Sequence, residues 1–69
     1  MSNKNLSTRE INLLTRDGGN GQNVYLVSAC QTFTARVIRS RTVKGQQQVR
    51  RLSDGKWLNV HPSDTFIVG

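Results

Sequence analysis

With 69 residues, 35% of them hydrophobic, and a net charge of +6, the chain is long enough for one small domain with a thin core. Its one cysteine, Cys30, excludes an internal disulfide, and we expect this side chain to be buried and apolar in a reducing compartment. No apolar run approaches the roughly 20 residues of a membrane helix, and the polar start lacks the apolar centre of a signal peptide, so we expect a cytoplasmic protein without membrane contact.

The N-terminal part is predicted to be a disordered segment over residues 1–5 and a short amphipathic helix over residues 6–16. Ser7 is a suitable N-cap, and Glu10 follows it by three positions. This spacing allows a capping box, in which each side chain accepts a hydrogen bond from the backbone N–H of the other residue. The spacing therefore predicts where the helix begins.

The apolar residues of this helix, Ile11, Leu13 and Leu14, form a stripe that must pack against something. Two roles stay open: the helix covers the core of the domain, or it is an arm that binds a partner. The glycine-rich residues 17–23 are predicted to be a linker. They lack the Lys-Ser/Thr pair and the following helix of a nucleotide-binding loop, so we do not expect phosphate binding there.

The rest of the chain, residues 24–69, is predicted to be all β. Alternation of apolar and polar residues predicts five short strands, over residues 24–29, 33–40, 47–53, 56–60 and 65–69. Lys44-Gly45 and Asp54-Gly55 are predicted hairpin turns, because glycine takes the positive φ that tight turns need. The predicted fold is therefore mostly β, a small five-stranded antiparallel barrel with a short N-terminal helix.

Three sequence elements follow one another within residues 33–68: Ala35-Arg36-Val37, then the Asp54-Gly55 turn with Trp57, then Val60 to Asp64. This layout of the run FTARVIRSRTVKGQQQVRRLSDGKWLNVHPSDTFIV resembles the small five-stranded barrels of Tudor, KOW and Src-homology type. The resemblance implies the same barrel fold. Such barrels bind nucleic acids, peptides and modified side chains, so the fold alone does not decide the function.

Methyl-lysine recognition, an activity of Tudor domains, requires several aromatic side chains arranged around the cation. The chain has one tryptophan, one tyrosine and two phenylalanines, and both Phe33 and Phe66 are expected in the core. A basic surface would also repel a cationic peptide. The resemblance therefore does not carry this activity to the present chain.

Catalysis and metal or cofactor binding are not expected. Cys30 and His61 could form a thiol–imidazole pair, but His61 precedes a proline in a predicted turn, where an exposed position is favoured. Cysteine, histidine and the acidic residues nowhere cluster at the spacing of metal ligands. Each of the four acids has a local role in a helix cap, a loop or a turn. We therefore expect a non-enzymatic protein.

The basic residues are concentrated in residues 31–56, which hold seven Lys and Arg against Asp54 alone, a net charge of +6. A solubilising surface usually mixes both signs, so a cluster of one sign favours a polyanionic partner. If Lys44-Gly45 is a two-residue loop, counting away from it along both strands of the hairpin predicts which residues face each other. The predicted pairs include Arg39–Arg50, Arg41–Gln48, Ile38–Arg51 and Val37–Leu52. The first pair places like charges opposite each other, which destabilises a sheet unless an anion bridges them.

We predict that this basic hairpin binds the phosphate backbone of DNA or RNA, as part of an accessory or regulatory protein. The candidate nucleic-acid-binding residues are Arg36, Arg39, Arg41, Lys44, Gln46, Gln48, Arg50, Arg51, Lys56 and Trp57. Trp57 either stacks on a base or belongs to the barrel core or rim. Two alternatives stay open: arginines that only extend into water, and a protein-interaction module that binds an acidic surface of a larger machine to inhibit or recruit it. An open sheet edge would allow a homodimer.

Overall fold

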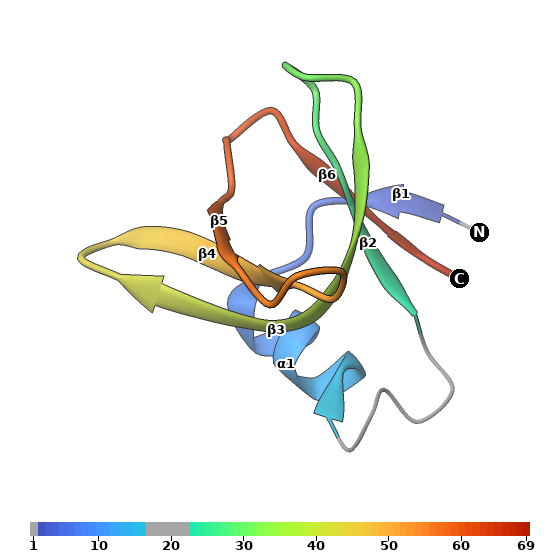
Figure 1. Ribbon diagram of the computed structural model, residues 1–69. Helices are drawn as coiled ribbons and strands as arrows, with labels where there is room; N and C mark the ends of the chain where they lie inside the picture. Colours follow the sequence, from blue (N-terminus) through green and yellow to red (C-terminus); the bar gives the residue numbers. More distant parts are fainter. Residues whose placement is uncertain (1, 17–22) are drawn as a thin grey trace.

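The computed structural model describes residues 2–16 and 23–69, which form a six-stranded antiparallel sheet and one short helix (Figure 1). In chain order the elements are β1 (Ser2–Lys4), α1 (Thr8–Leu14), β2 (Val24–Val27), β3 (Thr34–Val43), β4 (Gln46–Arg51), β5 (Trp57–Asn59) and β6 (Thr65–Val68). The mostly β class is confirmed, and all five strands predicted from residue 24 onward are present. Of the predicted linker, residues 17–22 lie outside the described residues.

The strand order β1-β6-β2-β3-β4-β5 leaves β1 and β5 as the edges of one open sheet, so the predicted barrel does not close, although the sheet curves (Figure 1). The three residues of β5 pair with β4. The chain then turns at residues 61–64, where Pro62 has no N–H to donate, and no ladder joins β5 to β6 in the described sheet. At the other edge, Ser2–Lys4 were predicted to be disordered but pair with β6.

The pairing of β3 with β4 shifts between Val37 and Arg39, and Figure 1 shows that β3 is strongly curved. Val37 takes Arg51 as its partner, and Ile38 is the extra residue with no Cα partner on β4. An extra residue of this kind is a β-bulge, which bends its strand and increases the local twist. Counting back from the turn assumes a regular ladder, so the predicted pairs Ile38–Arg51 and Val37–Leu52 are wrong.

The core lies on the inner face of the curved sheet and is completed by the N-terminal segment. Its buried apolar members are Leu6, Ile11, Val24, Leu26, Val37, Val49 and Phe66. Most come from alternate positions of β2, β3 and β4, as expected when successive strand residues point to opposite faces. Phe66 comes from β6, and Leu6 and Ile11 come from the segment before α1 and from α1 itself. The burial of Ile11 supports the first of the two roles predicted for the helix.

The helix begins as the sequence predicts. The Ser7 hydroxyl accepts a hydrogen bond from the Glu10 N–H (3.1 Å), and the Glu10 carboxylate accepts one from the Ser7 N–H (3.3 Å). Ile11 is fully buried, whereas Leu13 is 57% exposed, so the predicted apolar stripe does not pack against the core as a whole. At 3.6 residues per turn, Leu13 lies about 200° around the helix from Ile11 and so faces away from the sheet.

Polar contacts fasten α1 to β3. The Asn12 side-chain carbonyl accepts a hydrogen bond from the Ser40 N–H (3.0 Å), and the Ser40 hydroxyl donates to the Thr8 carbonyl (3.2 Å). The Thr8 and Thr42 hydroxyls are also within hydrogen-bond distance (3.3 Å). Ser40 is buried beneath the helix, and its satisfied polar groups hold α1 in one position along β3.

The loop between β2 and β3 differs from the sequence expectations. Cys30 is exposed rather than buried, and Phe33 is only half-buried. The loop is held by buried Asp64, whose carboxylate accepts hydrogen bonds from the Ala29 N–H and the His61 N–H, each at 3.0 Å.

Within the described residues, no helix has the length and apolar character needed to cross a membrane.

Candidate functional site

The outer face of β3, β4 and β5 carries most of the residues proposed from the sequence. Val49 is fully buried, so its neighbours Gln48 and Arg50 point to the opposite, solvent-facing side of β4. Their cross-strand partners complete two rows on this face, Arg39–Arg50–Trp57 and Arg41–Gln48–Asn59. The side chains of the two rows therefore share one surface, which we call the outer face.

The opposed arginines predicted from the hairpin turn are present. Lys44 and Gly45 form a two-residue loop with φ of +49° and +79°, and both positive values are required by the tight turn that suits a hairpin. Arg39 and Arg50 are direct Cα partners and are both exposed. Neither guanidinium makes an ion pair with a carboxylate of the described residues. The pair therefore presents two positive charges to solvent.

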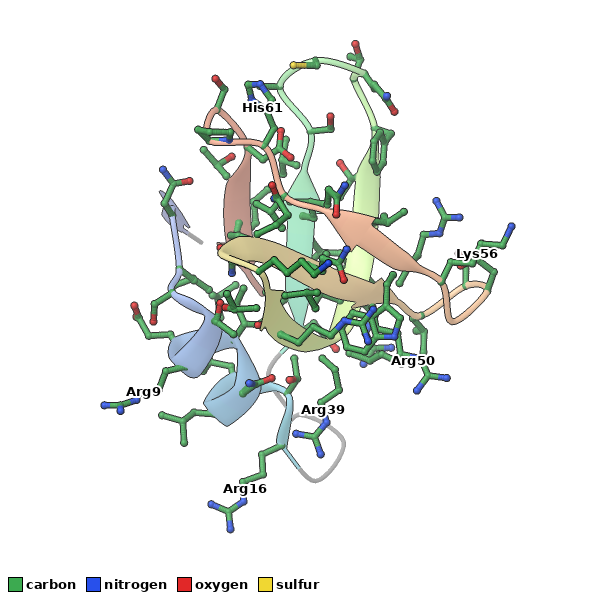
Figure 2. All side chains as sticks on the ribbon, turned by 90° about the vertical axis from the view of Figure 1, so that its left-hand side faces the viewer. Arg9, Arg16, Arg39, Arg50, Lys56 and His61 are labelled. Atoms are coloured by element: carbon green, nitrogen blue, oxygen red, sulfur yellow. The ribbon has the colours of Figure 1, made fainter. Side chains whose placement is uncertain are left out.

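These two arginines do not point the same way. The Arg50 Nε donates to the Gly55 carbonyl (3.2 Å), which holds Arg50 beside the β4–β5 turn. Figure 2 shows Arg39 extending toward the helix side of the molecule, where Arg16 also lies, while Arg50 and Lys56 lie toward the β4–β5 turn. Because the two guanidinium groups diverge, one extended anion with several charges suits them better than a single small ion.

The second row is tied together by hydrogen bonds. The Arg41 Nε donates to the Gln48 side-chain carbonyl (2.9 Å), and the Gln48 amide donates to the Asn59 side-chain carbonyl (2.7 Å). The Arg41 Cζ lies 4.0 Å from the centre of the Trp57 ring. This distance is typical of a cation–π contact, in which the guanidinium packs over the aromatic face. The four side chains form one connected polar layer.

Arg51 follows Arg50 on β4 and therefore points to the other side of the strand, where it forms an ion pair with Asp54. Its Nε donates to the Asp54 carboxylate (2.9 Å), and a terminal amino group contacts the other carboxylate oxygen. The hydrogen bonds from Arg51 are the largest cause that holds the pKa of Asp54 well below its usual range. A hydrogen bond from the Lys56 N–H (3.1 Å) is the second cause. The side-chain hydrogen bond with Asp54 raises the pKa of Arg51. Arg51 therefore contributes no uncompensated charge to the surface.

The remaining predicted residues occupy separate positions. Lys44 is exposed at the hairpin tip, and Lys56 is exposed after the β4–β5 turn. Arg36 is exposed opposite Tyr25 on β2, on the far side of the bulge. Gln46 has a structural role, because its amide donates to the Val60 carbonyl (2.9 Å). The lysines and Arg36 therefore flank the outer face, whereas Gln46 secures the end of β5.

A basic hollow beside α1 was missed in the sequence. It has a volume of about 590 Å³ and is lined by Thr8, Arg9, Asn12, Leu13, Arg16 and Arg39. Arg9 precedes Asn12 and Leu13 by three and four positions, and Arg16, just after α1, follows them by four and three. This spacing was the signal that these residues share one face. What the sequence did not indicate is that Arg39 of β3 completes the hollow and so links it to the outer face.

Cys30 and His61 both line a second cavity of about 290 Å³, and Figure 2 shows His61 at the end of the molecule away from the helix. Both residues are exposed, and the His61 Nδ1 accepts a hydrogen bond from the Ser63 N–H (3.1 Å). No hydrogen bond joins the thiol to the imidazole in the described part of the chain. Across residues 2–16 and 23–69, no group of three or more His, Cys, Asp or Glu is placed to hold a metal ion.

No protein-family model matches the chain, and no curated protein or solved structure was found to be similar to it. The likeness of residues 33–68 to small five-stranded barrels therefore stays a prediction from the sequence pattern.

Proposed function

We propose that the protein is a cytoplasmic, non-enzymatic accessory or regulatory factor that binds nucleic acid with its outer face. The observation that carries this proposal is the exposed Arg39–Arg50 pair, which has no carboxylate partner among the described residues. Like charges at paired positions of a sheet repel each other, and because these two guanidinium groups diverge, an extended anion that contacts both offsets that repulsion. A planar guanidinium also matches phosphate oxygens well.

The surroundings of this pair favour a long polyanion. Arg36, Lys44 and Lys56 are exposed cations beyond the two rows, and no hydrogen bond occupies their side chains within the described residues. Contacts of this kind go to the sugar–phosphate backbone and carry little sequence information. We therefore expect the affinity for nucleic acid to depend strongly on salt and only modestly on sequence.

An exposed edge strand can also pair with a second copy of the chain, and we include a homodimer in the proposal. Sedimentation tests whether this homodimer forms.

The experiment is a titration of labelled duplex DNA, single-stranded DNA and RNA at several salt concentrations. If Arg39 and Arg50 each neutralise one phosphate, log affinity should fall with log salt with a slope of magnitude about 1.8 on duplex DNA. On single strands the corresponding magnitude is about 1.4. Additional flanking contacts would steepen it. Failure to bind any of the three nucleic acids at low salt would overturn the proposal.

A second candidate function rests on the hollow beside α1. There Leu13, 57% exposed, lines the hollow together with Arg9 and Arg39. An apolar side chain surrounded by cations suits an acidic protein segment that carries an apolar residue, and such a module could inhibit or recruit a larger machine.

A labelled acidic peptide containing leucines tests this second candidate. If the protein binds the peptide but no nucleic acid, and Leu13→Ser abolishes peptide binding, the second candidate replaces the first. If Leu13→Ser leaves nucleic-acid affinity unchanged and the peptide does not bind, the first is retained.

A further inference from the structure

Arg41 covers one face of the Trp57 ring, so a nucleobase cannot stack on that face. The Arg41 Cζ is 4.0 Å from the ring centre, and Trp57 is half-buried in the outer-face row of β5. The sequence left open whether this tryptophan stacks on a base or belongs to the core. The geometry indicates a third role, in which Trp57 supports a cation that itself faces solvent.

Arg41 is held in this position from two directions. Trp57 packs against its guanidinium, and the Gln48 side-chain carbonyl accepts from its Nε at 2.9 Å. Gln48 is itself fixed by its hydrogen bond to Asn59 at 2.7 Å. Arg41 remains exposed although both of these contacts are made. A long side chain that is already ordered loses less conformational freedom when a ligand binds to it.

We propose that Arg41 is a stacking platform for an unpaired nucleobase, so that the ligand of the outer face is single-stranded nucleic acid. This inference rests on the proposed function. The base lies on the exposed side of the guanidinium, forming the layers base, Arg41 and Trp57. Arg39 and Arg50, in the neighbouring row, contact the phosphates on either side of that base.

The selection of single strands follows from the geometry of stacking. In a duplex each base face is covered by the next base pair, whereas an unpaired base can lie flat on an aromatic ring or a guanidinium plane. A phosphate-only surface would bind duplex at least as well, because duplex DNA has the higher charge density. The Arg41 platform therefore turns a general polyanion site into one that prefers single strands.

The test compares a labelled single-stranded oligonucleotide with its duplex by anisotropy, in wild type and in Arg41→Lys. We expect the wild type to prefer the single strand, and Arg41→Lys to weaken single-strand binding about tenfold, since the plane is lost while the charge is kept. Duplex affinity and the salt slope should be unchanged. Because Trp57 is the one tryptophan, its fluorescence should also change when the single strand binds to wild type.

Arg39→Lys is the matched control, because it makes the same replacement at an arginine assigned to phosphate. It should weaken single strand and duplex alike and leave the preference between them intact. Equal affinity of wild type for both forms, or an unchanged preference in Arg41→Lys, would overturn the platform while leaving nucleic-acid binding in place. Absence of binding to either form would overturn both proposals. Circular dichroism melts confirm that each variant is folded.

Discussion

The two faces of β3, β4 and β5 are built from alternate residues of the same strands, yet they have opposite characters. Val49, on the inner face, is fully buried between Ser40 and Leu58, while Arg50 beside it is exposed. Burial of apolar area on the inner face stabilises the fold. The outer face contributes charge that the fold itself does not require. Substitutions on the two faces should therefore separate stability from binding.

A finer contrast exists within the basic cluster, between two adjacent residues of β4. Arg50 is exposed opposite another arginine, whereas Arg51 is paired with Asp54 in the following turn. Both add the same charge to the sequence. Only Arg50 adds to the charge of the outer face, because Arg51 points to the other side of β4 and its charge is neutralised by Asp54. The number of arginines in a segment therefore overstates the charge of the site.

The largest expected effect comes from placing a charge on the inner face. Val37→Asp buries an unpaired carboxylate at a position that is 2% exposed, and its cost of several kcal/mol is comparable to the whole stability of a small domain. We expect no cooperative thermal transition. Val43→Asp is the matched change, because Val43 is 40% exposed, and it should melt like wild type. A cooperative wild-type melt of Val37→Asp would contradict the inner-face assignment.

The two sides of α1 should differ in the same way. Ile11→Ala removes a fully buried side chain and should lower the free energy of unfolding by about 2–4 kcal/mol. Leu13→Ala, at an exposed position, should change it by less than about 0.5 kcal/mol. Urea denaturation of both variants measures the difference. Equal effects would mean that the helix does not cover the core in the way described.

On the outer face, Arg39→Ala and Arg50→Ala should each reduce nucleic-acid affinity by about tenfold and lower the magnitude of the salt slope by about one. Removing one of two opposed charges should leave Arg39→Ala as stable as wild type or slightly more so. Arg50→Ala should gain less, because it also loses the hydrogen bond to Gly55. The measurements are salt-dependent binding and thermal melts.

The control for these variants is Arg51→Gln combined with Asp54→Asn, which removes a neutralised pair and keeps the net charge. Its affinity and slope should match those of wild type. A loss as large as that of Arg39→Ala would show that Arg51 contacts the ligand despite Asp54. A loss of affinity confined to one nucleic-acid sequence would instead mean that the arginines read base edges.

Asp54→Asn alone tests the contrast between Arg50 and Arg51 by removing it. The amide keeps an oxygen to accept the Lys56 N–H but removes the charge that neutralises Arg51. If the freed Arg51 reaches a phosphate, affinity should rise a few-fold and the slope should steepen by about 0.9 on duplex DNA. Anisotropy at several salt concentrations checks this. A decrease in affinity would contradict it.

The smallest expected effect is on stability at acid pH. Because folding lowers the pKa of Asp54, the ion pair contributes its full stabilisation above the carboxyl's ordinary pKa of about 4 and loses it as the pH falls below that value. The pair is exposed, so the change should be small. Melting temperatures of wild type and Asp54→Asn should converge as the pH falls below about 4. A constant gap across that range would contradict the effect.

Local sequence determined the features that depend on a few neighbouring residues. The Ser7–Glu10 spacing predicted the capping box, and the Lys44-Gly45 loop predicted that Arg39 and Arg50 would face each other. These succeeded because a cap or a two-residue turn constrains the backbone directly. The alternation of apolar and polar residues likewise predicted the five strands and the mostly β class.

Only the tertiary structure decided which side chains find partners. The bulge at Ile38, the open sheet and the exposure of Cys30 depend on how the strands pack together, which no short segment specifies. The same is true of Arg41 resting on Trp57, because these residues meet across three strands. A turn is fixed by the backbone preferences of its own residues, whereas a guanidinium is placed by whatever surface the folded chain brings to it.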